Sequence, residues 1–246
     1  MNKFKKNIER IEEMKVLSGL RETIENQKKY KTIDLIINEI KNKTNDSYQY
    51  LIVLVGIPAS GKSTFIKKLK KIVNNQGVLE RDKMVILNAK IINREIKNRN
   101  LSHEPLTYDK SFTLKGENKK QIDDNINQLM NRKEELVQNK KFVIADRTNL
   151  TKASRKQFID KFPKRKIIAI DFYRALKDVD DNKKLNAFIL NAKQREDKQK
   201  DIVKKKTLDQ SVFARMLKQY EIPGKNEGID IIYNVSYQEL KNIIKL

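Results

Sequence analysis

The feature that most constrains this chain is a short apolar run that stops at a glycine and leads into a lysine-bearing helix. Residues 50–55 read YLIVLV, a length and composition typical of a buried parallel strand. The residues that follow, Gly56–Thr64, read GIPASGKST and contain the complete pattern G-x-x-x-x-G-K-[ST]. Because a strand precedes the pattern and a helix is predicted over residues 62–74, the context is that of a phosphate-binding loop (P-loop).

Each position in this loop has a chemical reason. Gly56 and Gly61 allow backbone conformations closed to other residues, so that successive N–H groups can converge on phosphates at a helix N-terminus. Lys62 is expected to bridge the β- and γ-phosphates, and the Ser63 hydroxyl to ligate Mg²⁺. The nucleotide, ATP or GTP, is therefore assigned to Gly56, Pro58, Ala59, Ser60, Gly61, Lys62, Ser63 and Thr64.

Further apolar runs predict a parallel sheet with helices on both faces. Runs at 142–145, 167–172 and 229–233 alternate with charged, helix-like stretches. Residues 77–81 are expected to supply another short strand, although 84–87 is apolar too and leaves that boundary open. The predicted fold class is α/β, a P-loop kinase-like parallel sheet flanked by helices, in a kinase domain over residues 47–246.

Residues 1–46 show a different pattern. Apolar residues recur at helical spacing over 8–24 and again over 33–40, with a break around 27–32. The polar stretch 41–47 then resembles a linker. We predict a helical N-terminal appendage over residues 1–46, and its interpretation is packing or docking because it carries no visible chemistry.

The amino-acid composition excludes several kinds of functional site and suggests a kind of partner. The chain has no cysteine and one histidine, His103, which excludes disulfides, thiolate metal sites, cysteine nucleophiles and a histidine cluster. A metal must then be held by oxygen ligands, for which Mg²⁺ is the natural candidate. With 54 Lys+Arg against 32 Asp+Glu, the formal net charge of +22 suits a polyanionic partner such as nucleic acid. A lysine-rich composition imposed by AT-rich coding DNA is the competing explanation.

The same composition bears on location. No apolar run reaches the ~18 residues needed to cross a bilayer, and the N-terminus lacks the apolar core of a signal peptide. We expect no membrane partner and a cytoplasmic location, and the oligomeric state is left open.

A kinase site also needs a group that aims the acceptor hydroxyl. Asp82 follows the strand expected within 77–81, and strand ends are where such groups lie in doubly wound sheets. We predict Asp82 as the general base, with a helix N-cap as the structural alternative.

The metal and the transferred phosphoryl group need further partners. Asp146 ends the run 142–145, where it can accept from a Mg²⁺-bound water or from Ser63. Thr148 and Thr151 follow it, and for these hydroxyls substrate contact and helix capping both remain open. Arg195, in the charged helical region 183–206, is the candidate lid arginine that reaches over the nucleotide.

Taken together, these residues resemble the 5′-hydroxyl polynucleotide kinases of the phage type and the kinase modules of RNA-repair and tRNA-ligase enzymes. The motifs that carry the resemblance are G-x-P-x-S-G-K-S-T at 56–64, Arg81-Asp82, D-x-T-N-L at 146–150 with Arg155, and Arg195. The resemblance spans about 50–235, with 108–130 as a helical insertion. It implies transfer of the γ-phosphate of ATP or GTP to the 5′-hydroxyl of a DNA or RNA strand, in nucleic acid repair or modification.

The resemblance also implies residue roles. Lys62 and Ser63 would handle the donor and Mg²⁺, Asp82 would activate the 5′-hydroxyl, Asp146 would support the metal, and Arg195 would neutralise the transferring group. Arg81, Thr148 and Asn149 would contact the substrate.

Two departures from the family pattern matter. The family arginine that grips the acceptor's neighbouring phosphate corresponds to Val85 here, and Arg94 and Arg99 are the candidates to replace it. The chain also contains neither the D-x-D-G-T phosphatase signature nor the K-x-D-G nucleotidyltransferase signature, so we expect no removal of 3′-phosphates and no nick sealing.

Two alternatives therefore stay open. One is a P-loop kinase that acts on another hydroxyl, such as a hydroxymethylated base in DNA or a nucleotide sugar in the manner of zeta-type toxins. The other is a non-catalytic, nucleotide-dependent switch that docks through its N-terminal residues.

Overall fold

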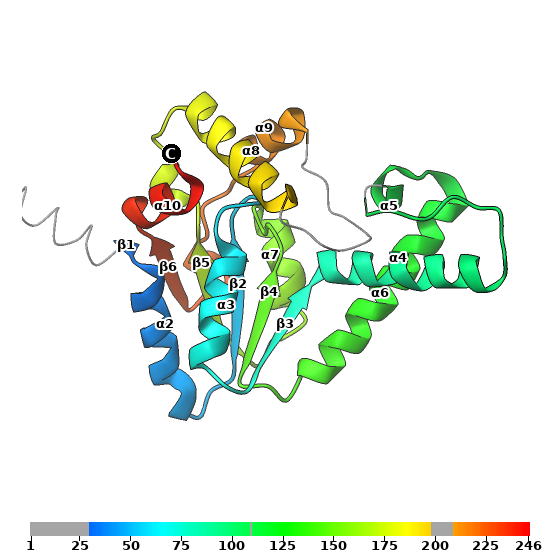
Figure 1. Ribbon diagram of the computed structural model, residues 1–246. Helices are drawn as coiled ribbons and strands as arrows, with labels where there is room; N and C mark the ends of the chain where they lie inside the picture. Colours follow the sequence, from blue (N-terminus) through cyan, green and yellow to red (C-terminus); the bar gives the residue numbers. More distant parts are fainter. Residues whose placement is uncertain (1–29, 109, 198–208) are drawn as a thin grey trace, which may run out of the picture.

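The computed structural model describes residues 30–108, 110–197 and 209–246 (Figure 1). Residues 1–29, 109 and 198–208 lie outside this description, as do the side chains of residues 195–197. The helix expected over 8–24 is therefore outside the described residues.

The described residues contain a six-stranded parallel sheet, which confirms the predicted α/β class. The strand order is β1-β6-β5-β2-β4-β3. The strands are β1 (Tyr30–Lys31), β2 (Tyr50–Val55), β3 (Gln76–Glu80), β4 (Phe142–Asp146), β5 (Lys166–Asp171) and β6 (Ile231–Val235). The strand that leads into the P-loop, β2, lies between β4 and β5, so the loop emerges from the interior of the sheet.

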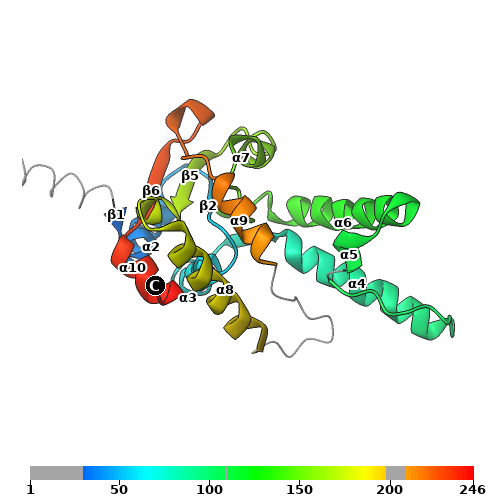
Figure 2. The same ribbon diagram turned by 90° about the horizontal axis from the view of Figure 1, so that it is seen from above.

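Helices cover both faces of this sheet (Figures 1 and 2). They are α2 (Ile33–Asn42), α3 (Lys62–Ile72), α4 (Arg81–Asn98), α5 (Lys110–Thr113), α6 (Gly116–Val137), α7 (Lys152–Ile159), α8 (Asp181–Asp197), α9 (Gln210–Lys218) and α10 (Tyr237–Ile244). The described residues also form the 3-10 turns η1 (Lys43–Asn45), η2 (Arg174–Leu176) and η3 (Lys225–Glu227). In the described part of the chain, no helix is both long enough and apolar enough to cross a bilayer.

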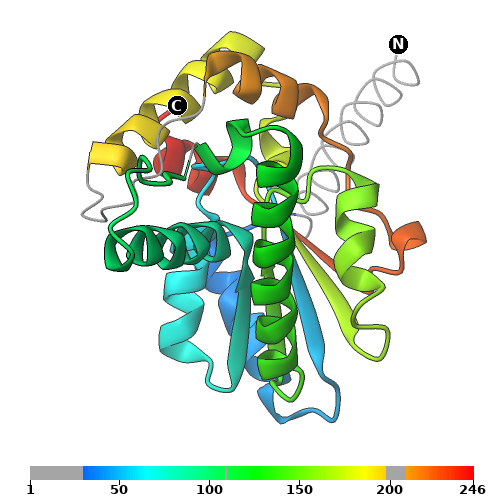
Figure 3. The same ribbon diagram turned by 90° about the vertical axis from the view of Figure 1, so that its right-hand side faces the viewer.

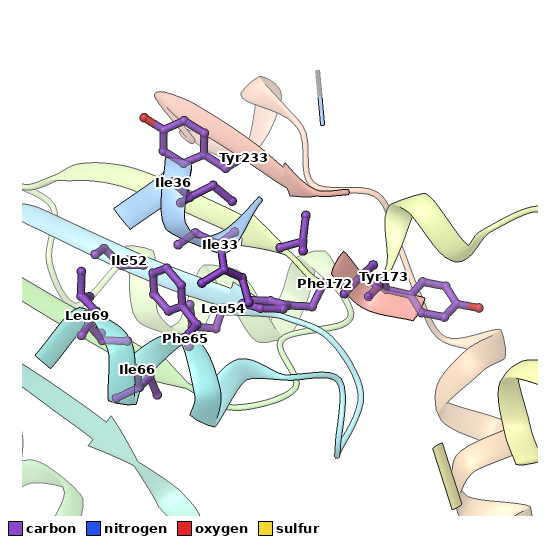
Figure 4. Close-up of a cluster of buried hydrophobic side chains, with 14 of the residues drawn as sticks. Ile33, Ile36, Ile52, Leu54, Phe65, Ile66, Leu69, Phe172, Tyr173 and Tyr233 are labelled. Carbon is purple, nitrogen blue, oxygen red and sulfur yellow. The ribbon is translucent and has the colours of Figure 1, made fainter. Parts of the chain in front are cut away.

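Alternation along the strands sorts the core into two layers. Every residue of β2 is buried, as expected for a strand covered on both faces. Ile52 and Leu54 pack with α2 and α3, where Phe65 and Leu69 of α3 face them (Figure 4). Their neighbours along the strand, including Val53, pack on the opposite side with α6 and α7.

The N-terminal part of the described chain joins the same sheet and core. β1 pairs with β6, and α2 buries Ile33, Ile36, Ile37 and Ile40 completely in the α3 layer. Their helical spacing places all four on one face. The boundary expected at residue 46 therefore does not coincide with a break in packing. Helical periodicity indicates that a face is buried but does not identify the element that buries it.

Between β3 and β4 the chain forms a helical insertion made of α4, α5 and α6, which extends beyond the β3 edge of the sheet (Figures 1 and 3). The apolar residues 84–87, which make the end of the preceding strand ambiguous in the sequence, belong to α4. The insertion has its own small apolar cluster, which includes Val85, Tyr108 and Ile126. Since α4 begins directly after β3, this cluster lies next to the carboxyl edge of the sheet where the P-loop emerges.

Candidate nucleotide and acceptor site

The P-loop backbone adopts the conformations that its glycines permit. Gly56 has φ +156° and Gly61 has φ +101°. A Cβ atom at Gly56 would lie 2.6 Å from the Ser60 Oγ, and one at Gly61 would lie 3.0 Å from the Ile243 Cδ1. A side chain at either position would strain the backbone and would crowd the neighbouring side chain.

The start of α3 is suited to an anion. Gly61 is the N-cap residue, no side chain caps the helix, and its first turn holds no acidic residue. The first backbone N–H groups of a helix have no partner within the helix, and they carry partial positive charge. A phosphate at this position would satisfy these donors, which is the standard use of such a loop.

Lys62 is held over this loop. Its side chain is buried, and its Nζ donates to the carbonyl oxygens of Gly56 at 2.7 Å and Ile57 at 2.8 Å. These bonds keep the ammonium group beside the N-terminus of α3. Ser63 and Thr64 are exposed in the first turn of the same helix, Pro58 and Ala59 are partly buried, and Ser60 is buried.

Asp146 ends β4 and is paired in register with Leu54 of β2 and Glu80 of β3. Asp146 therefore lies at the carboxyl end of the strand next to the one that leads into the P-loop, and its role at a metal site stays a prediction. Together, Ser63 and Asp146 offer a hydroxyl and a carboxylate, the hard oxygen donors that suit Mg²⁺, which usually takes one or two protein ligands and completes its shell with phosphates and water. The described residues contain no group of three or more acidic or histidine side chains able to hold a metal alone. The donor set therefore fits a metal that arrives with a nucleotide.

The segment after Asp146 is bound to the P-loop through backbone groups. The carbonyl of Thr148 accepts from the N–H of Gly56 at 2.9 Å. Asn149 is buried with φ +46°, and its Nδ2 donates to the carbonyls of Leu54 at 2.8 Å and Ala145 at 3.1 Å. In this structure Asn149 joins the ends of β2 and β4, and the substrate contacts expected of Thr148 and Asn149 stay predictions.

The next threonine has a structural role. Thr151 is the N-cap of α7 and forms a capping box with Ser154, which confirms capping as the explanation for this hydroxyl. The guanidinium of Arg155, fully buried, donates to the carbonyls of Asn149 and Leu150 and forms a bidentate ion pair with Glu227 at 2.7 and 2.9 Å. Arg155 thus anchors the D-x-T-N-L segment to the C-terminal part of the chain.

Asp82 lies in the first turn of α4, directly beyond the carboxyl end of β3. The N-cap of this helix is Glu80, so the capping alternative for Asp82 does not describe this structure. The hydroxyl of Tyr108, a buried residue of the insertion, donates to Asp82 Oδ1 at 3.0 Å. This partner lies 26 positions along the chain, and nothing in the sequence linked it to Asp82.

Two arginines flank Asp82. Arg81 donates to Asn127 Oδ1 at 3.1 Å and lies 3.7 Å from Asp123 Oδ1, both on α6. Arg147 is partly buried, and burial together with the neighbouring charge of Arg81 lowers its pKa, while Asp82 acts in the opposite direction. Arg147 is the unspecified position of the D-x-T-N-L motif, so the motif gave it no role, although its place one residue beyond a strand end was a usable signal.

Helix α8 lies over the carboxyl edge of the sheet (Figures 1 and 2). Asn191 of α8 donates through Nδ2 to the carbonyl of Ala59 at 2.8 Å and to that of Ile243 at 3.2 Å. The candidate lid arginine, Arg195, is one helical turn further along α8. Its side chain lies outside the described part of the structure, so its role stays a prediction.

A buried carboxylate under the loop was also missed. Asp171 ends β5 beside Val55, and it is fully buried. It accepts from the backbone N–H groups of Tyr173 at 2.8 Å and Arg174 at 3.1 Å, and from the Tyr220 hydroxyl at 2.5 Å. Burial raises the pKa of Asp171 above its usual range, against the lowering effect of these hydrogen bonds.

This fold and loop define a nucleotide-binding P-loop protein with a kinase-like parallel sheet. A sequence model of the family described as "Chromatin associated protein KTI12" matches residues 50–231. The chain belongs to this KTI12 family. The coarser part of the sequence resemblance, a P-loop kinase-like protein, is thus confirmed, whereas the family that matches is not the phage-type polynucleotide kinases.

Solved structures similar to this chain include a kinase and a Kti12 protein. A fungal RNA kinase has a TM-score of 0.40 and 11% identity, covering 81% of this chain and 83% of that one. Kti12 from Chaetomium thermophilum in complex with ADP-AlF3 has a TM-score of 0.41 and 12% identity, covering 79% and 95%. A third structure, described as an ATPase domain, has a TM-score of 0.21 and 13% identity, covering 90% and 69%. No curated protein matches the sequence.

Proposed function

We propose that this chain is a Mg²⁺-dependent kinase that transfers the γ-phosphate of ATP or GTP to the 5′-hydroxyl of a DNA or RNA strand. The observation that carries the proposal is the placement of Asp82, whose carboxylate is hydrogen-bonded by Tyr108 on the same sheet edge as the P-loop. An aspartate oriented by a neighbour and placed at a strand end is suited to aim an attacking hydroxyl.

The donor half of the reaction follows from the loop. On nucleotide binding, Lys62 exchanges its bonds to the Gly56 and Ile57 carbonyls for phosphate oxygens, so its charge is already in place. When bound with the nucleotide, Mg²⁺ would neutralise charge that develops on the phosphates, with Ser63 and Asp146 as its protein partners. Arg195 is proposed to approach from α8, the helix that Asn191 ties to the loop.

The acceptor half rests on Asp82. Its carboxylate accepts a hydrogen bond from the acceptor hydroxyl, aims the oxygen at the γ-phosphorus and takes the proton as the new P–O bond forms. The bond between the γ-phosphorus and the β–γ bridging oxygen breaks in the same step, and ADP or GDP leaves. The formal charge of +22 suits a strand held through its phosphates. Binding of a single strand should then weaken with salt, with a slope of about −0.7 in log K per neutralised phosphate.

A panel of acceptors tests this proposal. The full chain is incubated with γ-labelled ATP or GTP, Mg²⁺ and 5′-hydroxyl DNA, 5′-hydroxyl RNA or the same strands carrying a 5′-phosphate. We expect label on the 5′-hydroxyl strands alone. Label that appears only as inorganic phosphate would instead identify a nucleotide hydrolase or switch.

One observation favours a second acceptor class. Val85, at the position where the phage-type kinases carry an acceptor-binding arginine, is fully buried in the cluster of the insertion. The acceptor contact made there in those kinases is therefore absent from this position. The same assay with hydroxymethylated duplex DNA and a nucleotide sugar tests this alternative, which predicts label on one of these in place of the 5′ ends.

A further inference from the structure

Arg81 and Arg147 occupy equivalent positions on neighbouring strands. Glu80 of β3 is paired in register with Asp146 of β4. Arg81 directly follows Glu80, and Arg147 directly follows Asp146. Adjacent strands lie about 4.8 Å apart, so the two arginines leave the sheet side by side. Asp82, the candidate base, is the next residue along the chain from Arg81.

Each arginine is held by a different flanking helix. Arg81 contacts Asn127 and Asp123 on α6. Arg147 donates to Gln157 Oε1 at 3.4 Å, and its guanidinium lies 6.0 Å from the ring centroid of Phe158, both on α7. These contacts restrict the two guanidinium groups before any ligand arrives, which lowers the entropic cost of binding one.

The positive charge of this pair is incompletely balanced. Among the described residues Arg147 forms no ion pair, and Asp123, the partner of Arg81, is shared with Lys119 at 2.8 Å. Two guanidinium groups brought together at a partly buried edge would be stabilised by an anion.

We propose that Arg81 and Arg147 form a phosphate-binding pair that grips a phosphate of the acceptor adjacent to the hydroxyl aimed at Asp82. The planar donor fork of a guanidinium matches the oxygens of a phosphate. The pair would supply the contact that the buried Val85 cannot make. The identity of the phosphate as the acceptor's rests on the proposed function, whereas the anion site itself does not.

Equilibrium binding tests this pair without relying on catalysis. The full chain is titrated calorimetrically with a nucleoside 3′-monophosphate, with the corresponding nucleoside and with ATP. Arg147→Gln and Arg81→Gln should each weaken binding of the 3′-monophosphate by about ten- to hundredfold, the range expected for a charge-assisted hydrogen bond. Binding of the nucleoside and of ATP should not change, and Arg147→Lys should recover part of the loss.

Matched measurements make the result decisive. Arg132→Gln removes an exposed arginine elsewhere on α6 and should bind all three ligands as the wild type does. Unfolding midpoints show that each variant is folded. Unchanged binding of the 3′-monophosphate in folded Arg147→Gln and Arg81→Gln would overturn the inference. If the folded variants lose affinity for ATP and keep their affinity for the 3′-monophosphate, the two arginines belong to the donor site. That result would also overturn the inference.

Transfer assays separate this inference from the proposed function. Binding that depends on Arg147, combined with no labelling of any 5′-hydroxyl acceptor, would support the anion site and contradict the kinase proposal. If wild type and Arg147→Gln both label acceptors equally well with and without the adjacent phosphate, the kinase proposal is supported and the phosphate-binding pair is contradicted.

Discussion

The Tyr108 hydroxyl donates to Oδ1 of Asp82 at 3.0 Å, which ties the candidate base to the helical insertion. Tyr108 is 5% exposed, and its ring packs edge-on against Phe112 at 5.0 Å between centroids. Through this hydrogen bond the insertion helps to orient the carboxylate of Asp82. This relationship gives the insertion a direct part in the proposed reaction.

Tyr108→Phe should lower kcat about two- to tenfold and leave the KM for ATP unchanged. The variant keeps the packed ring and loses one hydrogen bond, whose net contribution corresponds to that range. Steady-state kinetics with a 5′-hydroxyl strand checks this. A kcat equal to that of the wild type would show that the bond does not orient the reactive group.

Asp82→Asn should lower kcat about 10²- to 10⁴-fold, the usual contribution of a general base. The binding of ATP should be spared because the P-loop is untouched. Calorimetric titration with ATP and single-turnover transfer separate the two effects. Full turnover in this variant would remove Asp82 from the role of base.

Asn191→Ala should loosen α8 from the P-loop. Asn191 donates to the carbonyls of Ala59 and Ile243, so its loss leaves both acceptors without this partner. We expect a loss of about 1–2 kcal/mol in the free energy of unfolding and a higher KM for ATP. Gln194→Ala on the same helix, where the contact is with the exposed Lys245, is the matched control and should change neither. Identical behaviour of the two variants would contradict the link between α8 and the loop.

Arg155→Ala should destabilise the fold by about 3–5 kcal/mol, because Glu227 would be left buried without its partner. Lys156→Ala removes the next residue from a largely exposed ion pair with Asp160 and should cost less than about 1 kcal/mol. Urea unfolding of both variants measures the difference. Equal costs would mean that the buried pair does not anchor the segment that follows Asp146.

Asp171 predicts a pH dependence of stability. Because burial raises its pKa in the folded state, the folded protein binds more protons than the unfolded chain above about pH 3.9. Its contribution to stability therefore falls as pH rises from that value through the raised pKa, and the loss is complete above it.

The comparison of wild type with Asp171→Asn isolates this effect. The free energy of unfolding of the wild type, relative to the variant, should fall as the pH rises above about 4. Tyr220→Phe removes a hydrogen bond that lowers the pKa of Asp171, and it should extend the fall to higher pH. If the difference in free energy of unfolding between wild type and Asp171→Asn is constant or rises with pH, the pKa of Asp171 is not raised in the folded state.

The sequence predicted the features that depend on local pattern. The P-loop, the strands around it and the strand-end positions of Asp82 and Asp146 follow from apolar runs and glycine spacing, and the structure places them accordingly. Helical spacing also predicted α2, although it could not show that α2 packs in the main core.

The contacts that complete the site could not be predicted from local sequence patterns. Tyr108 reaches Asp82 only because the insertion folds back, and Asn191 reaches Ala59 across 132 positions of chain. The burial of Asp171 depends on Tyr220, which arrives from after α9. Such partners are set by the tertiary fold, and single-sequence periodicity carries no record of them.

Transfer of label from γ-labelled ATP to a 5′-hydroxyl oligonucleotide, by the full chain with Mg²⁺, decides whether this protein is a 5′-hydroxyl kinase. Lys62→Met serves as the control because it removes the ammonium held at Gly56 and Ile57. If the chain is a 5′-hydroxyl kinase, the wild type should place label at the 5′ end of the strand and Lys62→Met should place none. Label found only as inorganic phosphate, with the strand unmodified, would contradict the kinase proposal.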